Sequence, residues 1–185
     1  MRKFVFIDES IRDSYVMAAV IVPIQRLGDY RKAMSGITVD LGLSSNQITN
    51  DGDGGTDSFT NAKGALIEIG GSLFADNLTG SANGDRFRPY GGDDVIDGKG
   101  GTDLVRYDRV EVANLAVDLA TGKATGTFGG AAFSHTLTSI EWIRGSFGND
   151  ILKGTDGNDR FETRTGNDTI EARGGDDWID LALGN

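Results

Sequence analysis

Residues 145–162 read GSFGNDILKGTDGNDRFE, and this stretch contains the pattern that decides the fold. Each half has glycines or asparagines, then an aspartate, one further residue and an apolar residue. Glycine and asparagine accept the positive φ angles of tight turns, and three residues with one inward apolar side chain make a minimal strand. Each nine-residue unit is therefore predicted to form one turn and one short strand, and two successive units are predicted to form a complete coil of a solenoid.

Aspartates recur every nine residues in two series, and an apolar residue stands two places after each one. The aspartates are Asp76, Asp85, Asp94, Asp103, Asp150, Asp159, Asp168 and Asp177. The apolar residues are Leu78, Phe87, Ile96, Val105, Leu152, Phe161, Ile170 and Ile179. With 22 aspartates in 185 residues and 38% hydrophobic residues, eight such pairs arise by chance with a probability of roughly 10⁻¹¹. The period is therefore a structural repeat, whose apolar residues are expected to form the core.

The two series belong to two related blocks of sequence. Aligning Gly71–Val105 with Gly145–Ile179 at a constant offset of 74 residues gives fourteen identities in 35 positions. We therefore expect an all-β fold, a parallel β-roll (β-solenoid) in two blocks joined by a spacer that continues the solenoid. The expected organisation is an N-terminal segment at 1–36, a roll at 37–185, repeat blocks at 71–108 and 145–185, and a spacer at 109–144.

Residues 1–36 differ from the rest of the chain in charge and composition. They carry six Lys/Arg and four Asp/Glu, whereas the remaining residues carry twelve and twenty-four. Two short apolar runs, followed by a helical spacing of Leu27, Tyr30 and Met34, predict a strand hairpin and a short helix. We expect this segment to be a cap on the open end of the solenoid or the remnant of a fusion.

The composition excludes several kinds of site and partner. The chain has no cysteine and one histidine, His135, which disfavours disulfide scaffolds, zinc centres and histidine-based catalysis. A net charge of −10 disfavours nucleic acid and anionic lipid as partners and favours cations. The longest apolar run, Val16–Val22, is too short to span a bilayer, and no secretory signal peptide is expected.

Aspartates eighteen residues apart should stack on the same side of successive coils. The expected pairs are Asp76–Asp94, Asp85–Asp103, Asp150–Asp168 and Asp159–Asp177. Neighbouring strands are about 4.8 Å apart, so the stacked carboxylates repel each other while turn carbonyl oxygens point into the same gap. Ca²⁺ accepts about six to eight oxygen ligands and relieves this repulsion, whereas Mg²⁺ requires a tighter octahedron. We therefore expect several Ca²⁺ ions, with all eight aspartates as metal ligands.

The repeats in residues 37–185 resemble the RTX, or haemolysin-type calcium-binding, nonapeptide family, whose pattern is G-G-x-G-x-D-x-U-x. Gly145–Lys153 and Gly154–Glu162 match it closely, and Gly80–Arg88 and Gly98–Arg106 match with substitutions at some glycines. The resemblance implies a calcium-binding module of a secreted bacterial protein that folds on binding Ca²⁺ outside the cell. It also implies export by a type I secretion machinery and an extracellular location.

Three turns depart from the family pattern at its two leading glycine positions. The residues there are Pro89-Tyr90, Thr163-Arg164 and Ala172-Arg173. Such turns are expected to bind the ion weakly or to leave half of a site empty. An isolated repeat surrounds Asp57, but its counterpart in the second block is His135, so no paired site is expected there.

Other interpretations of the same residues stay open. A metal-free solenoid or an acidic linker has a similar composition, although a linker has no use for an inward apolar residue in every repeat. The module is alternatively an accessory part of an extracellular enzyme or adhesin, but no catalytic domain is recognisable and we expect no enzymatic activity. Residues 4–10 (FVFIDES) resemble the opening of an uncharacterised RNase H-like family, in which Asp8 would bind a metal ion in a nuclease-like fragment.

Overall fold

The computed structural model describes residues 36–43, 48–50 and 68–181, which form one sheet of nine strands and one of six. No helix occurs among these residues, so none is long and apolar enough to cross a membrane. The predicted N-terminal hairpin and helix, and Asp8, lie outside the described residues. The strands are β1 (Thr38–Asp40), β2 (Ile48–Asn50), β3 (Glu68–Gly70), β4 (Asn77–Thr79), β5 (Arg86–Arg88), β6 (Val95–Asp97), β7 (Leu104–Arg106), β8 (Val112–Asp118), β9 (Lys123–Phe128), β10 (Ala131–Thr138), β11 (Trp142–Arg144), β12 (Ile151–Lys153), β13 (Arg160–Glu162), β14 (Thr169–Glu171) and β15 (Trp178–Asp180).

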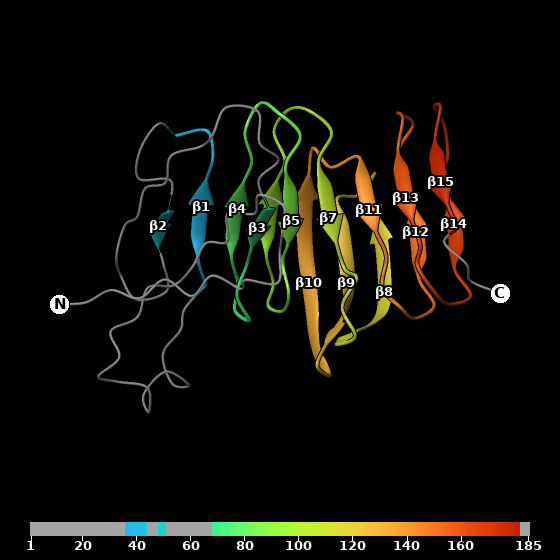
Figure 1. Cartoon of the computed structure of the whole chain (residues 1–185), viewed down its shortest axis with the longest axis horizontal. Helices are drawn as coiled ribbons and strands as arrows, with labels where there is room; N and C mark the ends of the chain where they lie inside the picture. Colours follow the sequence, from blue (N-terminus) through green and yellow to red (C-terminus); the bar gives the residue numbers. More distant parts are fainter. Residues whose placement is uncertain (1–35, 44–47, 51–67, 182–185) are drawn as a thin grey trace, which may run out of the picture.

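The predicted coil of eighteen residues is present in both blocks. β4 pairs in parallel with β6 so that Leu78 lies beside Ile96, and β5 pairs with β7 so that Phe87 lies beside Val105. β12 pairs with β14, and β13 with β15, with the same offset. Each coil contributes one strand to each sheet, and the strands follow one another along the long axis of the molecule (Figure 1). The prediction of an all-β parallel β-roll is confirmed.

The apolar residue two places after each aspartate points into the roll in the interior coils. Six of these residues are at most 1% exposed, namely Leu78, Phe87, Ile96, Val105, Leu152 and Phe161. The two in the last described coil are less covered, since Ile170 is half-buried and Ile179 is 43% exposed. β14 and β15 are the end strands of their sheets, so no further coil among the described residues packs over them.

The spacer forms an antiparallel meander that the nine-residue pattern did not predict. β8, β9 and β10 are antiparallel neighbours in the nine-stranded sheet, between β6 of the first block and β12 of the second. In the six-stranded sheet, β11 alone lies between β7 and β13. Two extra strands, at about 4.8 Å each, make the nine-stranded sheet about 10 Å longer across the spacer. Both sheets thus continue through the spacer, with three strands in the nine-stranded sheet and one in the six-stranded sheet.

Three stacked rings fill the interior beside the meander. Phe133 and His135 lie on β10 with ring centroids 4.2 Å apart, and Tyr107 stacks on Phe133 at 5.9 Å. All three side chains are buried, and the Tyr107 hydroxyl lies 3.1 Å from His135 Nδ1. Burial lowers the pKa of His135 to about 4, so its ring is neutral at pH 7. The histidine therefore acts as part of the core.

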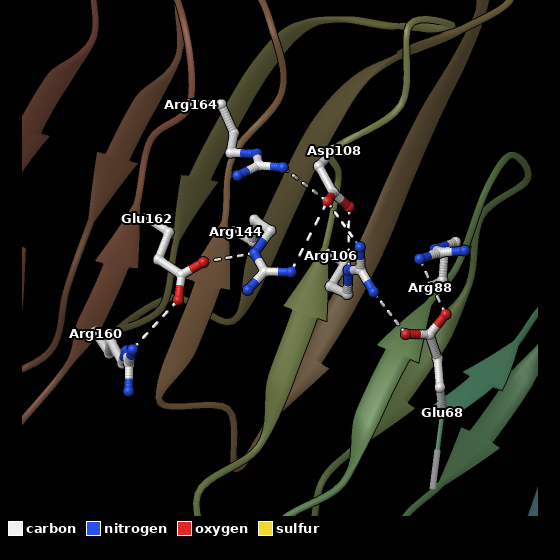
Figure 2. A network of polar contacts seen from close by, with 8 residues as sticks. All are labelled: Glu68, Arg88, Arg106, Asp108, Arg144, Arg160, Glu162 and Arg164. Carbon is white, nitrogen blue, oxygen red and sulfur yellow. Dashed lines mark hydrogen bonds and ion pairs between the residues drawn. The ribbon is translucent and has the colours of Figure 1, made fainter. Parts of the chain in front are cut away.

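A network of arginines and acids covers the outer face of the six-stranded sheet. Its members are Glu68, Arg88, Arg106, Asp108, Arg144, Arg160, Glu162 and Arg164 (Figure 2). Arg106 pairs with Glu68 at 2.7 Å and with Asp108 at 2.8 Å, and Arg144 pairs with Glu162 at 2.5 Å. Because each carboxylate is largely covered and shared between arginines, the network stabilises more than isolated surface pairs do. It links strands of both blocks without a metal ion.

Leu152 and Ile151 are neighbours on opposite faces of β12, with Leu152 fully buried and Ile151 49% exposed. We predict that Leu152→Ala lowers the free energy of unfolding by about 2–5 kcal/mol, because it leaves a cavity in a thin core. Ile151→Ala should change it by less than about 1 kcal/mol. Urea unfolding in saturating Ca²⁺ measures both, and equal losses would show that the two faces are wrongly assigned.

Candidate metal sites

The eight aspartates lie in two columns along the roll. The first column precedes strands of the nine-stranded sheet and contains Asp76, Asp94, Asp150 and Asp168. The second column precedes strands of the six-stranded sheet and contains Asp85, Asp103, Asp159 and Asp177. Because the paired strands are in register, aspartates eighteen residues apart occupy equivalent places in neighbouring coils.

A direct hydrogen bond joins the two aspartates of each pair. The backbone N–H of the earlier aspartate donates to Oδ1 of the later one at 2.7–2.9 Å in all four pairs. The pairs are Asp76–Asp94, Asp85–Asp103, Asp150–Asp168 and Asp159–Asp177. The carboxylate of the later aspartate is thus held against the turn of the earlier one.

A hydroxyl residue stands four places before the earlier aspartate of each pair. These residues are Ser72, Ser81, Ser146 and Thr155. In every case both the backbone N–H and the hydroxyl donate to the carboxylate, as Ser81 does to Asp85 Oδ2 at 2.6 and 2.9 Å. Our reading of the repeat did not identify these groups, although their constant spacing is visible in the sequence.

The glycine that opens each earlier turn leaves room for two oxygen atoms to face the same point. A β-carbon at Gly80 would lie 2.9 Å from Asp85 Oδ2 and 2.5 Å from the carbonyl oxygen of Gly98, in the next coil. Equivalent contacts occur at Gly71, Gly145 and Gly154. A carboxylate oxygen and a carbonyl oxygen therefore converge beside each of these glycines, and both are ligands that Ca²⁺ prefers.

The later turn of each pair contains two residues of positive φ. The second is always glycine, and the first is Tyr90, Lys99, Arg164 or Arg173, with φ between 66° and 93°. The backbone of these four residues adopts a left-handed conformation, which costs a residue other than glycine about 1–2 kcal/mol. The departures from the family pattern at Tyr90, Arg164 and Arg173 thus leave the backbone in the conformation that glycine would adopt.

Two carboxylate oxygens of the later turns are buried without a hydrogen-bond donor. They are Asp94 Oδ2 and Asp103 Oδ2, and both residues are at most 1% exposed. Burial, reinforced by neighbouring carboxylates, raises the pKa of Asp94 to about 8 and that of Asp103 to about 7. Burial also raises the pKa of Asp150 to about 6. Such carboxylates lack a positive partner, and a divalent cation would supply one.

The donor set fits a cation that accepts both carboxylate and carbonyl oxygens. Among the described residues, no three acidic or histidine side chains form a group that could hold a metal ion. A cation in these turns would therefore need backbone carbonyl oxygens as well, such as the one beside Gly80. Ca²⁺ takes mixed oxygen ligands in flexible geometry, whereas Mg²⁺ keeps most of its water. The turns therefore suit Ca²⁺.

The first column ends at the spacer in both blocks. β10 pairs with β6 in the register that places His135 beside Asp94, and β8 pairs with β12 in the register that places Leu115 beside Asp150. His135 Nε2 lies 3.3 Å from Asp94 Oδ2, and both side chains are fully buried. A neutral histidine and an apolar leucine thus replace the acid at the two inner ends of this column.

The second column continues through the spacer. β11 pairs with β7 and β13 in the register that places Glu141 between Asp103 and Asp159. The backbone N–H of Asp103 donates to Glu141 Oε2 at 3.1 Å, as it would to an aspartate of a pair. Glu141 lies nine residues before Asp150 and two before Ile143, so the repeat series extends to it. From the sequence, only aspartates were considered at this position of the repeat, so Glu141 was not predicted as a member of the series.

A parallel roll whose turns bring carboxylate and carbonyl oxygens together in successive coils defines a class of metal-binding repeat protein. The family model described as RTX calcium-binding nonapeptide repeat (4 copies) matches residues 70–105, 136–164 and 153–185. Through these segments the chain belongs to the RTX calcium-binding nonapeptide repeat family, which confirms the resemblance seen in the sequence. None of the curated proteins compared with the chain matches it.

The raised pKa values predict how pH affects the metal-free roll. Asp94 and Asp103 have folded pKa values of about 8 and 7, above their usual 3.8, so the folded state binds more protons than the unfolded state. The free energy of unfolding should therefore fall as pH rises from 6.5 to 8.5. His135, with its lowered pKa, contributes the opposite slope only below about pH 6.5.

Far-UV circular dichroism of the chain freed of metal, in enough sucrose to populate both states, measures this slope. Asp94→Asn imitates the protonated carboxyl and should flatten the slope while raising stability at pH 8.5. A metal-free roll that becomes more stable between pH 6.5 and 8.5 would contradict the assignment of these carboxyls as buried and unpaired.

Proposed function

We propose that the repeats hold Ca²⁺ ions between turns eighteen residues apart, with the paired aspartates and nearby turn carbonyl oxygens as ligands. The proposed ligands are Asp76, Asp85, Asp94, Asp103, Asp150, Asp159, Asp168 and Asp177. Calcium binding is the property of the repeat family to which the chain belongs, and the proposal adds the residues that perform it here.

The Oδ2 atom of Asp103, which is buried and has no hydrogen-bond partner, is the main support for this proposal. Leaving an acceptor buried and unpaired costs about 1–3 kcal/mol, and more when the group is charged. The same arrangement of opening glycine, carboxylate and carbonyl oxygen recurs at four places in the roll. A bound cation would coordinate these oxygens at each of the four places. Without a cation, each turn would need its own positively charged or hydrogen-bond-donating side chain.

Calcium binding drives the folding of the roll outside the cell in this proposal. The residues after the N-terminal segment carry twenty-four acids against twelve Lys/Arg, and the three-residue strands of the blocks bury at most one or two apolar residues each. Such a chain is poorly stable while its aspartates repel each other. Extracellular calcium modules have dissociation constants of about 10⁻⁴–10⁻³ M, so the chain stays unfolded in the cytosol and folds after type I secretion.

The repeats have a structural role and no catalytic role in this proposal. The carboxylates of the columns accept hydrogen bonds from backbone N–H groups and from hydroxyls of the turns, which hold them in place in the scaffold. Nucleic acid is not a partner, because the charge of −10 would repel it.

Adding Ca²⁺ to the metal-free full chain at pH 7.5 should convert a coil-like far-UV circular dichroism spectrum into a β spectrum. EDTA should reverse the change, because the ions are released from the folded roll. Mg²⁺ at the same concentration serves as the control cation and should produce little change. A spectrum that does not respond to about 10 mM Ca²⁺ would overturn the proposed function.

Asp159 and Asp156 lie in the same turn. Asp159 is buried and belongs to the second column, whereas Asp156 is exposed and lies outside both columns. We predict that Asp159→Asn raises the Ca²⁺ concentration at the folding midpoint by about tenfold, because affinity follows the number of charged ligands. Asp156→Asn removes the same charge and should leave the midpoint within about twofold of the wild-type value. Equal shifts in the two variants would mean that net charge, and not ligation, controls folding.

A further inference from the structure

The junction of the two blocks repeats the hydrogen bond that joins the aspartates of each pair. Within a pair, the N–H of the earlier aspartate donates to the carboxylate of the later one, as Asp85 does to Asp103. At the junction, the N–H of Asp103 donates to Glu141 Oε2 at 3.1 Å. Asp103 therefore ends one pair and begins another, whose second acid comes from the spacer and not from a nonapeptide turn.

The opening glycine of the Asp103 turn also has the geometry of a paired site. A β-carbon at Gly98 would lie 2.6 Å from Asp103 Oδ2 and would contact the carbonyl oxygen of Ser139. Gly80 has the same relation to Asp85 Oδ2 and to the carbonyl oxygen of the next coil. A carboxylate oxygen and a carbonyl oxygen thus converge beside Gly98, and the carbonyl is supplied by the spacer.

The Asp103 turn differs from the other earlier turns in having no hydroxyl donor. Lys99 stands where Ser81 stands in the turn eighteen residues earlier, and its ammonium group pairs with Asp97 at 2.8 Å. Asp103 is 0% exposed, and its Oδ2 atom has no hydrogen-bond partner. This oxygen is therefore aimed into the space beside Gly98 with no proton donor to satisfy it.

A cavity of about 280 Å³ opens beside Glu141 toward the second block. Ser139, Ile140 and Glu141 line one side of it, and Thr155, Asn158 and Asp159 line another. The cavity lies beside the connection from β10 to β11, which has three residues, whereas six residues separate β5 from β6. Water and a hydrated cation can therefore reach the carboxylate of Glu141.

We propose that Glu141 completes an additional Ca²⁺ site at the junction of the two blocks, together with Asp103 Oδ2 and the carbonyl oxygen of Ser139. The site rests on the proposed function, namely that the repeat turns bind Ca²⁺. It extends the second column of sites through the spacer, so that this column runs unbroken from the first block to the second.

A purely structural role of Glu141 makes a different prediction. If Glu141 only accepts the N–H of Asp103, then Glu141→Gln keeps the acceptor and nearly the same shape, and the number of bound ions does not change. If Glu141 is a ligand, the amide loses the charge that the cation needs, whereas Glu141→Asp restores a carboxylate of the kind found elsewhere in the column.

The full chain, Glu141→Gln, Glu141→Asp and the control Glu111→Gln are equilibrated with saturating Ca²⁺, and bound calcium is counted by flow dialysis. Glu111 is exposed outside the columns, so its variant tests the effect of losing one charge. We expect Glu141→Gln to bind one ion fewer per chain than the wild type, and the other two variants to bind the wild-type number. A wild-type count in Glu141→Gln would overturn the junction site and leave the proposed function intact, whereas a wild type that binds no Ca²⁺ would remove the proposed function itself.

Lanthanide substitution in crystals of the wild-type chain tests the same site without relying on the folding of a variant. An anomalous peak of Tb³⁺ is expected about 2.4 Å from both Asp103 Oδ2 and the carbonyl oxygen of Ser139. Peaks between the aspartate pairs with none at the junction would overturn the inference, whatever the folding state of Glu141→Gln.

Discussion

Carboxylates buried in the turns without a positive partner are the constraint on which the rest of the roll depends. In the interior coils of each block the aspartates are nearly inaccessible to solvent, with their counterparts one strand spacing away. Backbone N–H groups and the hydroxyls of Ser72, Ser81, Ser146 and Thr155 satisfy part of these acceptors. Carboxylate and carbonyl oxygens converge beside the opening glycines, so the proposed Ca²⁺ ions would stabilise the fold by linking one coil to the next.

The apolar core and the arginine network stabilise the sheets of the roll and not its turns. The few buried apolar residues of the short strands give a thin core, which holds the two sheets together without neutralising any acid. The arginine network on the outer face binds Glu68, Asp108 and Glu162, none of which belongs to a column. It therefore ties neighbouring strands of the six-stranded sheet across both blocks and leaves the charge in the turns uncompensated.

The sequence predicted what depends on a strict period, and it missed what depends on packing across the spacer. Asp159 and Phe161 predict a strand by their spacing, because this nonapeptide forms its turn from its own glycines and asparagine. The strands β8, β9 and β10 follow no such period; they pair with one another as an antiparallel meander, and β10 places Phe133 and His135 in the interior beside Tyr107. Glu141 was missed for a simpler reason, since it keeps the spacing and changes only the residue type.

The first column of acids is interrupted at the spacer and the second continues through it, because the spacer adds three strands to one sheet and one strand to the other. In the nine-stranded sheet the meander separates the blocks by three strands, so Asp94 and Asp150 cannot be neighbours and are covered by His135 and Leu115 instead. In the six-stranded sheet the single strand β11 separates the blocks, and Glu141, immediately before that strand, lies in line with Asp103 and Asp159. A carboxylate at residue 141 therefore allows the second column of acids to continue from the first block to the second, whereas His135 and Leu115 interrupt the first column.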